Sequence, residues 1–215
     1  MPKEYELRYI NYDKKEIINR LIKLGAKQIH KPIIYEYMVF SHPHKKNQLD
    51  SYIRVRKEFD KITLTYKCNL KSKYVDEYEI LVSDYDTTIK MLNKMGLNKK
   101  YSIQKLREKW SIKGCKEIVF DTYPGLPDYM EIECDSVENI KKLEKKLGLS
   151  EEKVFHAGSL YKDLYNTSDR NSSNDLTFST VKKVIKPYIR KNHKLFNQIV
   201  SAQIKYINKL TKQNQ

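Results

Sequence analysis

Eight stretches of the chain are predicted to be strands, most of them because apolar and polar residues alternate with period two. In the first, residues 3–10, Tyr5, Leu7 and Tyr9 alternate with charged side chains. The other seven cover residues 26–40, 51–58, 61–68, 73–82, 99–112, 116–123 and 128–135. The stretches 51–58 and 61–68 are close enough in sequence to form a hairpin.

Helical spacing of apolar residues follows the first, fifth and eighth of these strands. Each helix is predicted to begin after a residue whose side chain can accept a hydrogen bond from the first turn, and to end at a glycine. The caps are Asp13, Asp84 and Ser136, and the stops are Gly25, Gly96 and Gly148. A short fourth helix is expected over residues 159–165.

The last quarter of the chain differs from the rest. Residues 166–175 are polar and turn-rich, which is typical of a linker. Apolar residues at helical spacing resume at Val181, and Pro187 is expected to kink or split that helix. We therefore divide the chain into a body (1–165), a linker (166–175) and a basic helical extension (176–215).

The net charge of +15 favours an anionic partner. Residues 166–215 hold ten Lys or Arg against two Asp, so RNA contact through the extension and packing of the extension on the body both stay open. The three cysteines form no metal or disulfide pattern, and reduced thiols are expected. The first residues show no apolar segment typical of a secretory leader, and the sequence has no run of about 18 apolar residues, so a cytoplasmic location without a membrane span is expected.

Charged residues sort by sign among the strands. Acids dominate one face of the strands 3–10, 73–82 and 128–135, and bases dominate one face of the strands 51–58, 61–68 and 99–112. These could be the solvated faces of an open antiparallel sheet. Two observations instead favour a β-barrel that encloses the charged faces. Acids and bases dominate different strands, and the predicted helices need the apolar face of the sheet to pack against. Acids in pairs suit a divalent cation, and bases suit phosphoryl oxygens.

Seven ordered blocks between residues 3 and 165 resemble one known family. "EYELR" (4–8) is similar to the ExExK motif that opens the CYTH, or triphosphate tunnel metalloenzyme, superfamily. "YIRVR", "LTYK", "DEYEI", "QKLREKW", "FDTYPGLPDYMEIE" and "SLYKDLY" follow in the family's order. The resemblance implies an α+β fold, an eight-stranded antiparallel β-barrel tunnel with helices packed outside it, here followed by the basic helical extension.

The resemblance also implies roles for individual residues. The catalytic, metal-binding acids would be Glu4, Glu6, Asp121, Glu131 and Glu133, which would hold Mg²⁺ or Mn²⁺. The phosphate-binding bases would be Arg8, Arg54, Arg56, Lys67, Lys105 and Arg107. Glu79, with Glu77 beside it, matches a further acid pair on the fifth strand and is counted among the catalytic residues.

Three functions fit this resemblance. The first is metal-dependent hydrolysis of inorganic triphosphate or of a nucleoside or organic triphosphate. The second is the class IV adenylyl cyclase reaction, which needs an adenine pocket that no motif here indicates. The third is non-catalytic binding of triphosphates or RNA ends, which would gain nothing from four carboxylates. The chain departs from the family motif at Arg8, where Lys is usual, and at Pro127 in the loop before the last strand.

Overall fold

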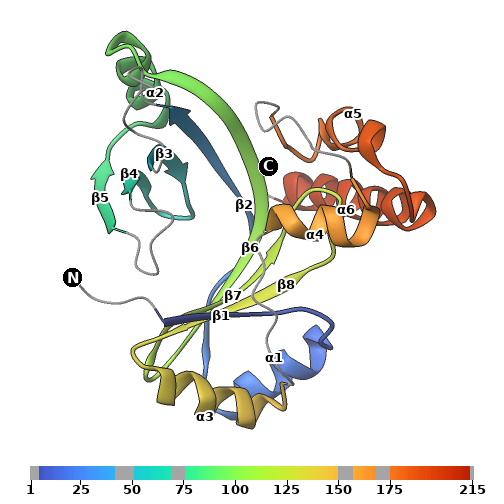
Figure 1. The fold of residues 1–215 in the computed structure, drawn as a ribbon. Coiled ribbons are helices and arrows are strands. Elements are labelled where there is room, and N and C mark those ends of the chain that lie inside the picture. The colour runs from blue at the N-terminus through green and yellow to red at the C-terminus, as the bar shows by residue number, and fades with distance from the viewer. Residues whose placement is uncertain (1–4, 42–50, 69–75, 150–156, 168–174, 214–215) are drawn as a thin grey trace. The chain divides into compact units, whose positions relative to one another are not determined.

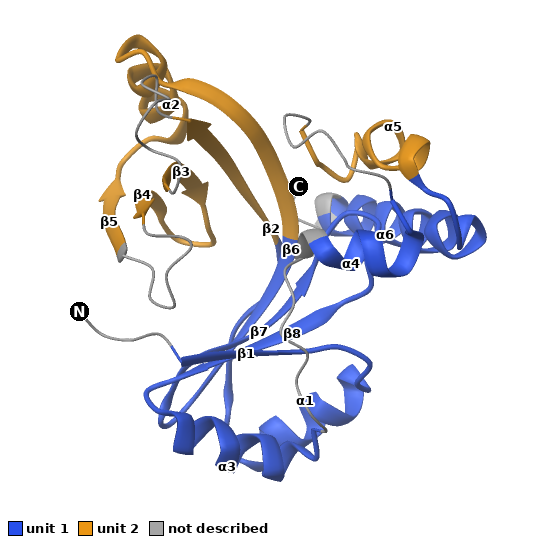
Figure 2. Cartoon of the chain, viewed as in Figure 1, with its two compact units in different colours: residues 1–33, 106–167, 189–215 blue, residues 34–105, 168–188 orange. Residues whose placement is uncertain are grey.

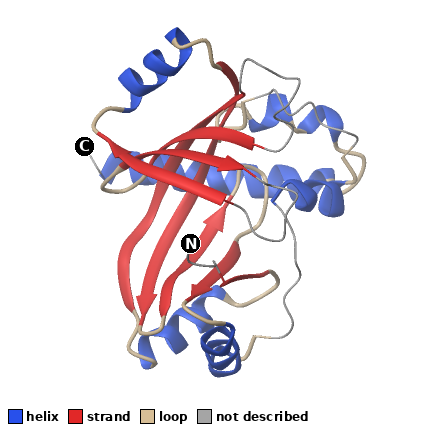
Figure 3. Ribbon diagram, turned by 60° about the vertical axis from the view of Figure 1, so that its left-hand side comes forward, coloured by secondary structure: helices blue, strands red, loops and turns tan. Residues whose placement is uncertain are grey.

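The computed structural model describes residues 5–41, 51–68, 76–149, 157–167 and 175–213. Its elements are shown in Figures 1 and 3. The strands are β1 (Tyr5–Tyr9), β2 (Lys27–Ser41), β3 (Ser51–Lys57), β4 (Ile62–Cys68), β5 (Asp76–Val82), β6 (Asn98–Ile112), β7 (Cys115–Thr122) and β8 (Tyr129–Cys134). The helices are α1 (Lys14–Lys23), α2 (Tyr85–Lys94), α3 (Val137–Leu147), α4 (Ala157–Tyr165), α5 (Val181–Val184), the 3-10 turn η1 (Lys186–Tyr188) and α6 (His193–Gln213).

The strands hydrogen-bond in the order β1-β8-β7-β6-β2-β3-β4-β5. The α+β class and the eight antiparallel strands expected from the sequence are confirmed. The chain forms two compact units (Figure 2), and β2 and β6 are long enough to contribute to both. Unit 1 comprises residues 1–33, 106–167 and 189–215, and unit 2 comprises residues 34–105 and 168–188.

Local capping sets where the helices begin. The Asp13 and Ser136 side chains accept hydrogen bonds from the backbone N–H groups of Glu16 and Asn139, at 2.9 and 3.2 Å. Asp84 caps α2 in the same way. All three predicted caps are confirmed, because each side chain satisfies an N–H group that the helix leaves free in its first turn.

The core of unit 1 lies between its strands and the helices α1 and α3. Tyr9, Ile118 and Ile132 from the strands pack with Leu21 of α1 and Ile140 of α3, all with at most 4% of their surface exposed. Tyr5 and Leu7 pack against the same cluster. The alternating residues of β1, β7 and β8 therefore point to the other face of the sheet.

Unit 2 has a smaller core. Phe40 of β2 and Val55 of β3 are fully buried and pack with Leu92 of α2. The segment that follows the predicted linker also belongs to this unit, because Leu176 forms a parallel bridge with Ile103 of β6. The linker itself lies mostly outside the described residues.

The cysteine expectation is wrong for two of the three residues. Cys115 at the start of β7 and Cys134 at the end of β8 lie opposite each other in the ladder and form a disulfide. Cys68 of β4 is not part of this disulfide. The pairing depends on the register between β7 and β8, and the spacing of the cysteines in the sequence does not reveal it.

No helix in the described residues is both long and apolar enough to cross a lipid bilayer.

Candidate functional site

A charged face on unit 1 is formed by β1, β6, β7 and β8, on the side of the sheet away from α1 and α3. The antiparallel register places Arg8 opposite Glu131 and Glu6 opposite Glu133. Arg8 donates from Nε to Glu131 Oε1 at 2.9 Å, and its Nη2 lies 2.5 Å from Glu6 Oε1. The two predicted acids and the predicted base thus meet on one surface because β1 pairs directly with β8.

Arg107 is a buried cation of this face. Its Nε and Nη2 donate to the two carboxylate oxygens of Asp121 at 2.7 and 2.6 Å. Nη2 also donates to Glu131 Oε2 at 3.0 Å, and Nη1 to Glu117 Oε1 at 3.2 Å. The face is therefore an alternation of guanidinium and carboxylate groups held in fixed geometry.

Both arginines stay charged in this setting. Burial alone would lower the pKa of each guanidinium, but nearby carboxylates outweigh it. Glu6 and Glu131 raise the pKa of Arg8 above its ordinary value. Asp121, Glu117 and Glu131 raise the pKa of Arg107 well above its ordinary value. Neither side chain can act as a proton donor or acceptor near neutral pH, so both are suited to binding anions.

Two other carboxylates of this face are paired with lysines. Glu133 Oε1 lies 2.7 Å from Lys116 Nζ, and Glu117 Oε2 lies 2.5 Å from Lys109 Nζ. The predicted ligand Glu4 lies outside the described residues.

A second charged face, on unit 2, is formed by β3, β4 and β5. Arg54 Nη2 lies 3.6 Å from Glu77 Oε1, and Arg56 Nη2 lies 3.6 Å from Glu79 Oε2. Thr65 donates its hydroxyl to Glu79 at 2.8 Å. Burial acts to raise the pKa of Glu79, but the Thr65 hydroxyl and the arginines outweigh it, so the pKa lies below its ordinary value.

Polar atoms on this face lack partners. The Nε atoms of Arg54 and Arg56 and the hydroxyl oxygen of Thr63 are buried without a hydrogen-bond partner in the described part of the chain. Only 14% and 18% of the two arginine side chains are exposed. A buried donor without an acceptor costs about 1–3 kcal/mol, and an anionic oxygen placed there would remove that cost.

The two remaining predicted bases also belong to unit 2. Lys67 Nζ lies 2.6 Å from Glu77 Oε2. Lys105, on β6, has only 6% of its surface exposed. Of the six predicted phosphate-binding bases, the structure thus assigns Arg8 and Arg107 to unit 1 and the other four to unit 2.

The predicted metal ligands fit a hard divalent cation by their chemistry, since all are carboxylates. No group of three or more acid, His or Cys side chains in the described ranges is arranged to hold a metal ion. Asp121 and Glu131 are instead held by Arg107, and Glu133 by Lys116. A cation bound at these acids would therefore share their carboxylate oxygens with the basic side chains or displace those side chains.

Sequence reasoning missed four residues near these faces. Glu117 falls at i−4 from Asp121 on the same strand face, and Glu58 falls at i+2 from Arg56, so period-two counting could have found both. The Tyr129 phenol donates to Asp121 at 3.4 Å, a contact no local pattern indicates. Glu108 lies on the face predicted to be apolar, where it accepts from Gln28 and Trp110.

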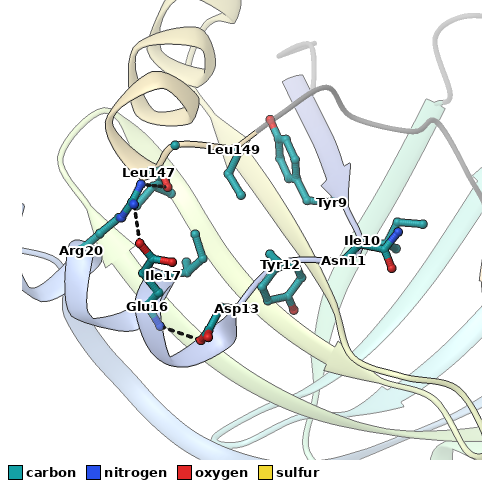
Figure 4. A pocket seen from close by; sticks show the side chains of 11 residues that line it. Tyr9, Ile10, Asn11, Tyr12, Asp13, Glu16, Ile17, Arg20, Leu147 and Leu149 are labelled. Carbon is teal, nitrogen blue, oxygen red and sulfur yellow. Dashed lines mark hydrogen bonds and ion pairs between the residues drawn. The ribbon is translucent and has the colours of Figure 1, made fainter.

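A pocket of about 190 Å³ lies elsewhere on unit 1, near the start of α1 and the end of α3 (Figure 4). Glu16 and Arg20 form an ion pair on its wall, and Arg20 also donates to the Leu147 carbonyl at 2.6 Å. Residues of the loop after β1, Tyr12 among them, complete the lining. None of the predicted site residues lines this pocket, so it is separate from the two charged faces.

Comparisons with known proteins show the family of the chain and the likeness of its fold. The family model described as "CYTH domain" matches residues 2–158. A curated protein named "Putative adenylate cyclase" from Methanocaldococcus jannaschii is 27% identical over 147 residues, which cover 67% of this chain and 83% of that protein. The PH1819 protein from Pyrococcus horikoshii is 27% identical with a TM-score of 0.56, over 74% of this chain and 98% of that one.

A second similar structure supports the fold alone. It is an X-ray structure titled "putative adenylate cyclase", from Vibrio parahaemolyticus. It is 14% identical with a TM-score of 0.61, over 74% of this chain and 97% of that one.

Proposed function

Because the chain belongs to the CYTH domain family, we propose that it is a divalent-metal-dependent hydrolase of a triphosphate-containing substrate. The observation that carries the proposal is the pair of buried guanidinium Nε donors of Arg54 and Arg56, which lack a partner in the described residues. A phosphoryl oxygen is the acceptor that suits a guanidinium best. The carboxylates on the same faces argue against a simple anion binder, because they would repel the anion unless a cation were bound.

Each predicted residue has a role in this proposal. The bases Arg8, Arg54, Arg56, Lys67, Lys105 and Arg107 bind phosphoryl oxygens. The acids Glu4, Glu6, Asp121, Glu131 and Glu133 are the candidate ligands of Mg²⁺ or Mn²⁺. A bound cation supplies neutralisation of the phosphate charge. Glu79 holds the Arg56 guanidinium and orients it for the substrate.

The reaction itself needs little covalent participation of the protein. A water oxygen attacks the terminal phosphorus in line, and the bond from that phosphorus to its bridging oxygen breaks. The terminal phosphoryl group becomes orthophosphate with the water's oxygen, the remaining diphosphate end leaves with the bridging oxygen, and the proton lost by the water passes to the products or to solvent. The guanidinium groups stabilise the charge that develops on the phosphoryl oxygens. Arg8 contributes by binding alone, since its raised pKa rules out proton transfer near neutral pH.

Adenylyl cyclisation is the second candidate, because the curated relative from Methanocaldococcus jannaschii carries that activity in its name. The 3′-hydroxyl oxygen of ATP would then attack the α-phosphorus, the bond from that phosphorus to the α,β-bridging oxygen would break, and pyrophosphate would leave. This reaction also needs a pocket for adenine. We favour hydrolysis because it requires the protein to bind only a phosphate chain and a cation. The charged faces provide basic side chains for the first and acidic side chains for the second.

RNA contact through the extension stays a prediction. The lysines of α6 that could make it, Lys194, Lys205, Lys209 and Lys212, are exposed.

The test incubates the full chain with Mg²⁺ or Mn²⁺ and a panel of inorganic triphosphate, ATP, GTP, thiamine triphosphate and 5′-triphosphate RNA. Release of orthophosphate supports hydrolysis, and cyclic AMP with pyrophosphate supports cyclisation. Arg56→Met should lower kcat/KM about 100-fold, as loss of a charge-stabilising group does. Glu138→Gln, an exposed acid on α3, is the matched control and should leave turnover unchanged. No product from any substrate would exclude both reactions.

A further inference from the structure

The loop between β7 and β8 is a tight turn on unit 1. The Leu126 backbone N–H donates to the Tyr123 carbonyl at 3.0 Å, and Gly125 has a φ of 80° that favours glycine. The loop starts two residues after Asp121 and ends three residues before Glu131. Its conformation therefore sets how the two acids of the charged face approach Arg107.

One side chain of α6 holds three backbone groups of this loop. The Gln203 amide accepts from the Gly125 N–H through Oε1 at 2.8 Å. Its Nε2 donates to the Leu126 carbonyl at 2.8 Å and to the Tyr123 carbonyl at 3.1 Å. Gln203 has 8% of its surface exposed, so these groups have little access to water that could replace it.

Helix α4 adds two more contacts to the same loop. The Tyr161 hydroxyl donates to the Pro124 carbonyl at 2.6 Å, and the Tyr165 hydroxyl to the Gly125 carbonyl at 2.5 Å. Both tyrosines are buried. All five hydrogen bonds thus come from residues beyond 158, where the family match ends. Buried backbone groups of a turn require such partners.

The loop connects to the charged face through two stacked rings. Tyr123 and Tyr129 lie with ring centroids 5.9 Å apart and planes 6° apart. The Tyr129 hydroxyl donates to Asp121 Oδ2 at 3.4 Å, and Asp121 is the bidentate partner of Arg107. A shift of the loop would therefore move the Tyr129 ring and, through it, the Asp121 carboxylate.

We propose that Gln203 is a positioning residue, which fixes the loop at residues 123–126 and thereby the placement of Asp121 against Arg107. Tyr161 and Tyr165 act with it, and the three side chains form a clamp contributed by the C-terminal part of the chain. The effect on turnover rests on the proposed function. The effect on the position of Tyr129 does not, and it can be measured separately.

The experiment uses the full chain with Gln203→Met, which has nearly the same shape and cannot make the three hydrogen bonds. Gln198→Met, an exposed glutamine on the same helix, is the matched control. The ring ¹³C resonance of Tyr129 should move in Gln203→Met and stay in place in Gln198→Met. At a temperature where both variants are folded, kcat should fall about tenfold or more in Gln203→Met with a smaller change in KM. The reason is that displacement of Asp121 and Arg107 slows the reaction of the bound substrate. If Gln203→Met does not fold, the same two measurements are made on Tyr165→Phe, which removes only the hydrogen bond to the Gly125 carbonyl.

An unmoved Tyr129 resonance in Gln203→Met would overturn the proposal, whatever the turnover. A moved resonance with the kcat of the control would overturn it as well, since the clamp would then only stabilise the fold. If the wild type hydrolyses none of the triphosphates, the proposed function fails, and the Tyr129 resonance alone decides whether Gln203 positions the loop.

Discussion

At the scale of single residues, Arg107 is a buried cation surrounded by carboxylates. It bonds to Asp121, Glu117 and Glu131, with 8% of its side chain exposed and none of that of Asp121. Removing charges from water costs several kcal/mol for each ion, and the fixed bidentate geometry is what offsets this cost. The network therefore tolerates the loss of a pair better than the loss of one partner.

Replacing Arg107 by Met should lower the free energy of unfolding by about 3–5 kcal/mol, because the buried Asp121 carboxylate then loses its bidentate cationic partner. The double variant Arg107→Met with Asp121→Leu should recover part of that loss. Urea unfolding followed by circular dichroism measures both. Lys109→Met is the control, since this lysine is 28% exposed and contacts Glu117 at the edge of the network. Equal losses in the single and double variants would contradict this account.

Glu79 provides a pH prediction at the same scale. Its folded-state pKa is lower than the ordinary value, so its charged form stabilises the fold above about pH 4.3 and this contribution is lost as pH falls through the folded-state pKa. Glu79→Gln should therefore lose less stability than the wild type between about pH 6 and pH 3. Unfolding free energies across that range measure the difference.

Thr65→Val tests the cause of that shift. The variant keeps the shape of the side chain and removes the hydroxyl that donates to Glu79 at 2.8 Å, so the pKa of Glu79 should rise towards its ordinary value. A titration of the Glu79 carboxyl resonance in the variant follows this directly. An unchanged titration would assign the shift to the nearby cations Arg56, Lys61 and Arg54.

At the scale of elements, Gly148 ends helix α3 and also allows Arg20 of α1 to approach the backbone there. Gly148 has a φ of 64°, and its N–H donates to the Lys145 carbonyl at 3.2 Å. A Cβ at this position would collide with the Arg20 guanidinium, which donates to the Leu147 carbonyl. The glycine is thus required by its backbone conformation and by the approach of α1.

Gly148→Ala should lower the free energy of unfolding by about 1–2 kcal/mol, because alanine is strained in the left-handed conformation. It should lower it by about 1 kcal/mol more, because the added Cβ displaces Arg20 from its hydrogen bond to the Leu147 carbonyl. Gly25→Ala is the matched control. Gly25 has a similar φ of 81° and nothing within 4 Å of the added Cβ, so only the first cost should appear. Thermal unfolding of both variants measures the difference, and equal losses would show that the Arg20 contact contributes nothing.

Elements whose signal is local were predicted well. Asp13, Asp84 and Ser136 begin helices as expected, because capping involves only the next three residues. Pro187 was expected to break the tail helix, and it lies in the 3-10 turn between α5 and α6. The Cys115–Cys134 disulfide was missed, because it depends on which residues face each other across two strands.

At the scale of the whole molecule, period-two counting placed Arg8 and Glu131 on charged strand faces before any pairing was known, and the register then brought them together. The same counting could not find Gln203, because a glutamine on a helix carries no periodic signal and its partners lie about 80 residues away. Side chains that act on the backbone of a distant loop are the class of residue that sequence patterns miss.

The residues beyond 158 supply hydrogen-bond partners to both units, and this affects which sequence changes must accompany their loss. Leu176 bonds to the backbone of β6 in unit 2, and Gln203 bonds to the loop before β8 in unit 1. A natural variant that lost these residues would have to replace both sets of partners at the same time. Relatives that lack these residues are therefore expected to carry other side chains that bind the loop backbone corresponding to residues 123–126.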